Sequence, residues 1–136
     1  MATARVAKIR IEELSNRGDQ RGPSYSVPEQ ALEYVGRVAD VHLGSSKPGA
    51  VRGNHYHLRR REAIVVLPGP RWSLHWDEGE GAAPLHRSFD GSQAVLVLLE
   101  PGTSHAVRND GKQPLWFVAC SSEPYDPSET VVRKLV

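Results

Sequence analysis

The stretch that decides the fold of this chain is Gly49-Ala-Val-Arg-Gly-Asn-His55-Tyr-His57-Leu-Arg-Arg-Arg-Glu62-Ala-Ile-Val-Val-Leu-Pro-Gly69. At its centre stand two histidines separated by one residue, and a carboxylate follows five residues after the second. In a β-strand, side chains at positions i and i+2 point to the same face. The pattern therefore predicts that His55 and His57 project together, roughly 7 Å apart along the strand.

The residues after the histidines predict a hairpin. Residues 58–61 have the length of a hairpin loop, and Glu62 then opens an apolar strand over 63–67. This places Glu62 directly across from His57, with Cβ atoms about 5 Å apart on one face of the sheet. Two imidazoles and a carboxylate would then converge on one point, which is the ligand set of a zinc or non-haem iron site.

Two segments of the sequence resemble the motifs of the cupin superfamily. The stretch 49–69 fits the first motif, G-x5-H-x-H-x3/4-E-x6-G, at all five defined positions. Residues 100–109, Glu-Pro-Gly-Thr-Ser-His-Ala-Val-Arg-Asn, fit the second motif at Gly102, His105 and Asn109, with Glu100 in place of its leading proline.

The cupin resemblance implies an all-β jelly-roll barrel or sandwich that binds one divalent metal ion. The residues that match the ligand positions are His55, His57, Glu62 and His105. Three imidazoles and a carboxylate suit zinc, iron, nickel, manganese or copper, so the residues leave the identity of the metal open.

The rest of the chain agrees with an all-β fold. Eight to ten short strands recur at roughly ten-residue spacing with Gly/Pro-rich turns between them, which is typical of a single jelly-roll domain over 1–136. Pro28 predicts one helical turn and no longer helix. The strands 63–67 and 94–99 are apolar on both faces, so we expect a second copy of the chain to cover their outward side in a homodimer.

Composition excludes several classes of partner. The net charge is only +1, from 17 basic and 16 acidic residues, which gives no case for binding nucleic acid or a membrane surface. No stretch approaches the roughly 20 apolar residues of a membrane span, and no signal peptide is visible. The single cysteine, Cys120, suits a reducing compartment, so we expect a cytoplasmic protein.

A narrower resemblance concerns the run Arg52-Gly-Asn-His-Tyr-His57. It is similar to the sugar-nucleotide branch of the cupins, which includes epimerases and ketoisomerases of dTDP-linked keto sugars and the C-terminal cupin of capsular polysaccharide-assembling reductases. The branch implies that Arg52 contacts a diphosphate and that His55 is the base beside a ketone. Its members often carry an Asp-x-Arg-Gly loop, which residues 19–22 match.

Several questions stay open at this stage. Because side chains alternate between the two faces of a strand, Arg52 is expected on the face opposite to His55, unless a bulge at Gly53 changes the alternation. The branch often uses a tyrosine as the acid, and no motif selects one from Tyr25, Tyr34, Tyr56 and Tyr125. His55 cannot offer one lone pair both as base and as metal ligand. Another metal-dependent enzyme, such as a dioxygenase, and a non-enzymatic ligand-binding cupin are the alternatives.

Overall fold

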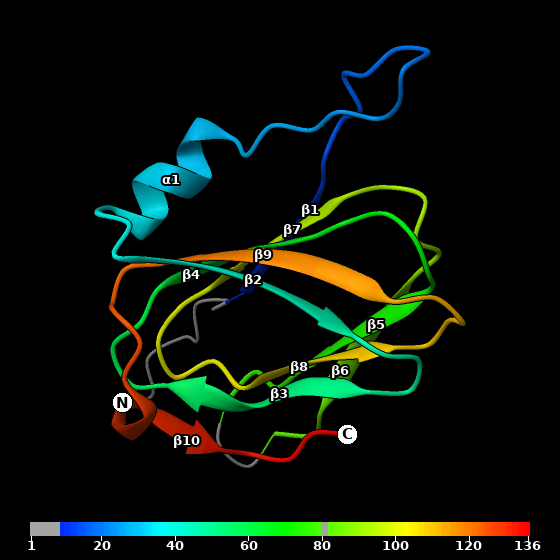
Figure 1. The fold of residues 1–136 in the computed structure, drawn as a ribbon. Helices are drawn as coiled ribbons and strands as arrows, with labels where there is room; N and C mark the ends of the chain where they lie inside the picture. The colour runs from blue at the N-terminus through cyan, green and yellow to red at the C-terminus, as the bar shows by residue number, and fades with distance from the viewer. Residues whose placement is uncertain (1–8, 80–81) are drawn as a thin grey trace.

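The computed structural model describes residues 9–79 and 82–136, which form two facing antiparallel sheets of five strands each (Figure 1). The elements are β1 (Ile9–Glu13), α1 (Glu29–Val35), β2 (Asp40–Ser46), β3 (Val51–His57), β4 (Glu62–Val66), β5 (Trp72–Trp76), β6 (Leu85–Phe89), β7 (Val95–Leu99), β8 (His105–Asn109), β9 (Leu115–Ser121), a 3-10 helix η1 (Pro127–Glu129) and β10 (Thr130–Val132).

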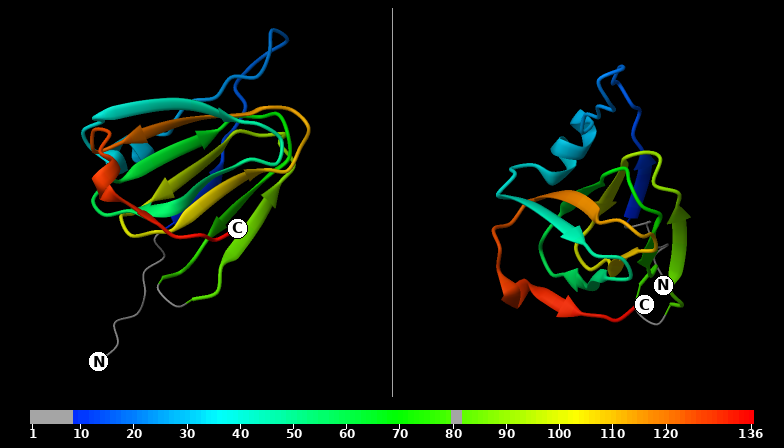
Figure 2. Two further views of the ribbon diagram at one scale, coloured as in Figure 1. Left: turned by 60° about the horizontal axis from the view of Figure 1, so that its bottom comes forward. Right: turned by 45° about the vertical axis from the view of Figure 1, so that its right-hand side comes forward.

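The strand order identifies the architecture as a sandwich. The first sheet runs β1-β7-β4-β9-β2 and the second runs β10-β3-β8-β5-β6. Figure 2 shows the two layers stacked face to face. The pairings among residues 9–79 and 82–136 leave the sheets separate, so the fold is a jelly-roll sandwich and not a closed barrel. The prediction of an all-β jelly roll is confirmed.

The apolar strands β4 and β7 lie in the middle of the first sheet and are buried on both faces. Alternate residues such as Ile64 and Val97 join Trp72 and Leu74 in the core between the sheets. The other residues of these strands join a second core on the outer side, beneath α1 and Leu14. The chain itself therefore covers these strands, and the prediction that a second copy is needed there is wrong. A homodimer stays a prediction without that support.

Helix α1 is longer than the single turn that Pro28 predicts. It has seven residues, and Gly36, whose φ is 78°, ends it. Buried Ala31 and Val35 pack it on the sheet, and the Arg61 guanidinium donates hydrogen bonds of 3.0 Å to two carbonyls of its last turn. Packing thus stabilises a helix too short to form alone. Among the described residues, no helix has the length and apolar character needed to cross a membrane.

The predicted hairpin between β3 and β4 is wrong. Strand β3 belongs to the second sheet, whereas β4 lies between β7 and β9 in the first. The Cα partner of His57 is Thr130 of β10, not Glu62. Residues 58–61 pass from one sheet to the other, because four residues can span roughly 13 Å and the layers stand about 10 Å apart. All five residues of β4 are buried between β7 and β9 at the centre of the first sheet, which pairing with the polar strand β3 would not provide.

Candidate functional site

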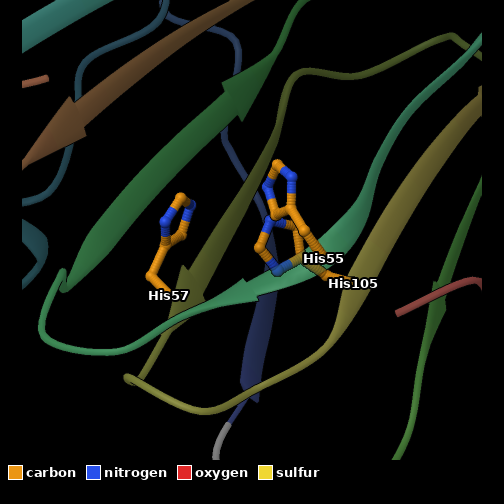
Figure 3. A group of neighbouring side chains, drawn as sticks. All are labelled: His55, His57 and His105. Carbon is orange, nitrogen blue, oxygen red and sulfur yellow. The ribbon is translucent and has the colours of Figure 1, made fainter. Parts of the chain in front are cut away.

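Three histidines meet on the inner side of the second sheet (Figure 3). His55 on β3 is the Cα partner of His105 on β8, and their ring centroids lie 4.9 Å apart. His57 follows two residues after His55 on the same face, with 4.8 Å between their ring centroids. One ring nitrogen from each of the three histidines lies within 4.8 Å of the others. Strand register therefore brings together two segments that are 48 residues apart in the sequence.

Glu62 completes the predicted group from the opposite sheet. Period-2 alternation along β4 points Glu62 inward with Ile64 and Val66. Its Oε1 lies 2.5 Å from His57 Nε2. The structure thus brings Glu62 to His57, although Glu62 arrives across the core and not across a hairpin. Among the described residues, the ligand atoms that lie within 4.8 Å of one another belong to the three histidines.

The site separates the protonation behaviour of its two neighbouring histidines. Burial, together with the charges of His105 and His57, lowers the pKa of His55 to about 4, so its imidazole is neutral near pH 7. Burial would lower the pKa of His57 too, but its contacts with Glu62 and Glu129 outweigh that and raise it. Burial holds the pKa of His105 below its ordinary value.

Hydrogen bonds fix the ring orientation of two histidines. The Nδ1–H of His105 donates to the Thr103 carbonyl at 3.0 Å, so the free lone pair of this neutral ring is on Nε2. His57 turns Nδ1 toward the carboxylate of Glu129 at 2.5 Å, so Nε2 faces Glu62. Ligand histidines of metal sites are oriented in this way.

The donor set fits a divalent cation. The buried Oε1 of Glu62 has no aligned hydrogen bond, despite its contact with His57. A cation held by His55, His57, His105 and Glu62 would satisfy that oxygen and both oriented Nε2 atoms.

Arg52 reaches the same side of β3 as His55 because the strand bulges between them. The register with β8 shifts between Gly53 and His55, and the φ values of Gly53 and Asn54 are 99° and 55°. Both Arg52 and His55 therefore line one cavity. Arg52 Nε donates to the Ser45 carbonyl at 2.9 Å, and its guanidinium lies 5.8 Å from the centroid of the Phe117 ring.

The cavity between the sheets has a volume of about 660 Å³ and contains the histidine cluster. Among the described residues, Tyr125 is the one tyrosine in its lining, and that side chain is 80% exposed. The Asp-x-Arg-Gly loop lies elsewhere. It projects from the sandwich between β1 and α1 (Figure 1), where Arg21 pairs with Asp19 at 2.8 Å.

Two polar residues of this region were missed by the sequence analysis. Glu129 is completely buried and contacts His57, which precedes it by 72 residues. Ser121 lines the cavity, and its buried Oγ has no hydrogen-bond partner. No spacing signal indicates either residue, because η1 and β9 reach the site only through the sheet topology.

A model of the polysaccharide biosynthesis C-terminal domain family matches residues 18–131 of the sequence. The chain belongs to this family. A comparison with curated proteins finds no match. The family assignment agrees with the resemblance inferred from residues 52–57.

Solved structures of low sequence identity share the fold of this family member. ChmJ, a 3'-monoepimerase from Streptomyces bikiniensis in complex with dTDP-quinovose, is 22% identical with a TM-score of 0.77, over 97% of this chain and 72% of ChmJ. The capsular polysaccharide assembling protein CapF from Staphylococcus aureus is 20% identical with a TM-score of 0.64, over 90% of this chain and 33% of CapF. The 3,4-ketoisomerase QdtA from Thermoanaerobacterium thermosaccharolyticum is 13% identical with a TM-score of 0.69, over 93% of this chain and 88% of QdtA. The cupin fold predicted from the two motifs is thereby confirmed.

Proposed function

We propose that this protein is an isomerase, an epimerase or ketoisomerase, that acts on a nucleotide-linked keto sugar in the cavity between its sheets. The observation that carries the proposal is the placement of His55 and Arg52 on one wall of a 660 Å³ cavity. An imidazole that is neutral near pH 7 can accept a proton, and a guanidinium fork suits a diphosphate. Pockets of about 300–1,000 Å³ accommodate small-molecule ligands.

The reaction begins at the carbon beside the ketone of the sugar. His55 takes a proton from that carbon, and the electron pair of the broken C–H bond moves into an enolate on the ketone oxygen. The bound diphosphate adds negative charge near His55, which favours its protonated form and strengthens it as a base. In the metal-free site, His57 stays paired with Glu62 and Glu129, and its raised pKa places positive charge beside the cavity, which stabilises the enolate through space.

The arrangement of the histidines favours ketoisomerisation over epimerisation. His55, His57 and His105 all project from the second sheet, so this cluster removes and returns a proton on one face of the sugar. Proton return to the neighbouring former carbonyl carbon on that face completes a ketoisomerisation, with the hydroxyl proton passing to the other oxygen. Epimerisation needs a donor on the opposite face. Tyr125 stands exposed among the cavity residues, which suits contact with the nucleotide better than proton donation at the sugar.

The proposal includes a divalent metal at His55, His57, His105 and Glu62. Such a cation supplies Lewis-acid polarisation of the ketone oxygen when it is bound. His55 then has no free lone pair on the coordinating nitrogen, so its roles as ligand and as base exclude each other. A coordinated His57 carries no proton on Nε2, so its role as a charged neighbour likewise belongs only to the metal-free mechanism. Activity of protein stripped by a chelator, compared with protein reloaded with zinc, distinguishes the two roles.

The test uses dTDP-4-keto-6-deoxyglucose in deuterium oxide, with products followed by NMR. We expect a ketoisomer that carries deuterium, no turnover by His55→Asn, and weaker binding by Arg52→Ala. Thermal stabilisation by dTDP-sugars and UDP-sugars, but not by 2-oxo acids, is the matching binding result. Stabilisation without turnover would refute the enzyme and favour a ligand-binding cupin. Oxygen consumption with 2-oxo acids would favour a dioxygenase.

A further inference from the structure

Glu129 is a completely buried carboxylate whose place in the fold the proposed reaction does not use. It ends η1, immediately before β10, and is 0% exposed. It is absent from the cavity lining, although its neighbours Pro127 and Thr130 are part of it. A buried charge of this kind is costly unless it is fully paired.

The partners of the Glu129 side chain are all donors from residues 57–60 of the first motif. Its Oε1 accepts from His57 Nδ1 at 2.5 Å, and its Oε2 accepts from the backbone N–H groups of Arg59 at 3.1 Å and Arg60 at 3.2 Å. The Glu129 carbonyl also accepts from the Leu58 N–H at 2.9 Å. Four hydrogen bonds thus join η1 to residues 57–60.

Only a carboxylate serves all three side-chain contacts. Both of its oxygens accept, whereas a glutamine would turn an NH2 group either toward the imidazole N–H or toward the two backbone N–H groups. Thr130 Oγ1, at 3.2 Å from Nδ1, is a second but longer contact on the same side of the ring.

We propose that Glu129 is a positioning residue that holds the Nδ1–H of His57 toward its own carboxylate, so that Nε2 faces Glu62 and the cavity. Without Glu129 the ring can rotate or change tautomer, and the Nε2–Glu62 contact is lost. The same carboxylate ties the segment 125–130, which contributes Tyr125, Asp126, Pro127 and Thr130 to the cavity lining, to the loop after His57. Its effect on turnover rests on the proposed function, whereas its effect on the His57 ring does not.

The test combines NMR of the His57 ring with kinetics on the full chain. In 15N-histidine-labelled wild-type protein, we expect a strongly downfield Nδ1–H proton, assigned through His57→Gln. Glu129→Gln should move this signal upfield or abolish it, because a neutral amide accepts more weakly than a carboxylate, and Glu129→Asp should restore part of the downfield shift. Glu123→Gln is the matched control, because Glu123 lies on the same segment without a contact to His57.

The kinetic arm uses the keto sugar of the proposed function. We expect kcat to fall about 10- to 100-fold in Glu129→Gln, the range seen when the partner of a site histidine is removed, while KM changes little. An Nε2–H tautomer of His57 in the wild-type protein would overturn the inference even if Glu129→Gln fails to fold. A signal that keeps its downfield position in Glu129→Gln would overturn it as well. Absence of turnover in wild-type protein would refute the proposed function and leave the NMR test intact.

Discussion

Replacing Gly53 with alanine is expected to damage the fold and the site together, because Gly53 forms the bulge between Arg52 and His55. The added Cβ would lie 2.6 Å from the His105 carbonyl oxygen and 3.0 Å from the Ala106 Cα. Both are backbone atoms, which cannot rotate away. The φ of 99° costs an L-residue roughly 1–2 kcal/mol, and overpacking typically costs about 1–3 kcal/mol more.

The assay is equilibrium unfolding in urea followed by tryptophan fluorescence, with Gly49→Ala as the control. Gly49 also has a positive φ, 81°, but an added Cβ there meets nothing within 4 Å. We expect Gly53→Ala to lose about 1–3 kcal/mol more of the free energy of unfolding than Gly49→Ala. Turnover should fall about 100-fold in Gly53→Ala alone, because the strand must shift under His55. Equal losses in the two variants would refute the close-approach argument.

Three further outcomes are expected. Arg52→Lys should raise the KM for a nucleotide sugar and leave kcat nearly unchanged, because an ammonium cannot form the bidentate contact with a diphosphate; steady-state kinetics checks this. The pKa of His55 is about 4 in the folded protein against an ordinary 6.5, so the unfolded chain binds a proton at this residue more readily. The contribution of His55 to the free energy of unfolding is therefore present above pH 6.5 and is lost as the pH falls toward 4. Urea titrations across that range should show a shallower loss in His55→Asn than in wild-type protein, and equal slopes would contradict this sign. Elemental analysis should find about one equivalent of divalent metal in wild-type protein and in His86→Asn, and none in His57→Ala. Metal-free wild-type protein with an intact fold after chelation would refute the metal site.

Much of the site follows from strand periodicity together with the resemblance to the cupin motifs. Alternation along β3 predicts that His55 and His57 share a face, and the second motif predicts that His105 joins them. The motif residue Asn109 proves structural, since its Nδ2 donates to the carbonyls of Ser46 at 2.9 Å and Gln113 at 2.7 Å. These features are set by local pattern and strand register.

Other features depend on which sheet a strand joins, and local pattern does not contain that information. A four-residue connection serves equally as a hairpin loop or as a crossing between layers, so Glu62 was assigned the right neighbour for the wrong reason. Glu129 was missed because its partner precedes it by 72 residues. From the sequence, the bulge at Gly53 was treated only as a condition for the role of Arg52. The structure shows that a glycine is needed there because the backbone of His105 approaches it closely.

The two sheets meet without a shared ladder, and this has a consequence for ligand exchange. Strands β2 and β10 are both edges, and both contribute residues to the cavity. No strand pairing bridges the gap between these two edges among the described residues, so other contacts hold the layers together there. One link across that gap is the hydrogen bond from Arg52 to the Ser45 carbonyl. We expect a diphosphate that binds the Arg52 Nε–H to displace this hydrogen bond, which links ligand binding at Arg52 to the contact between β3 and β2.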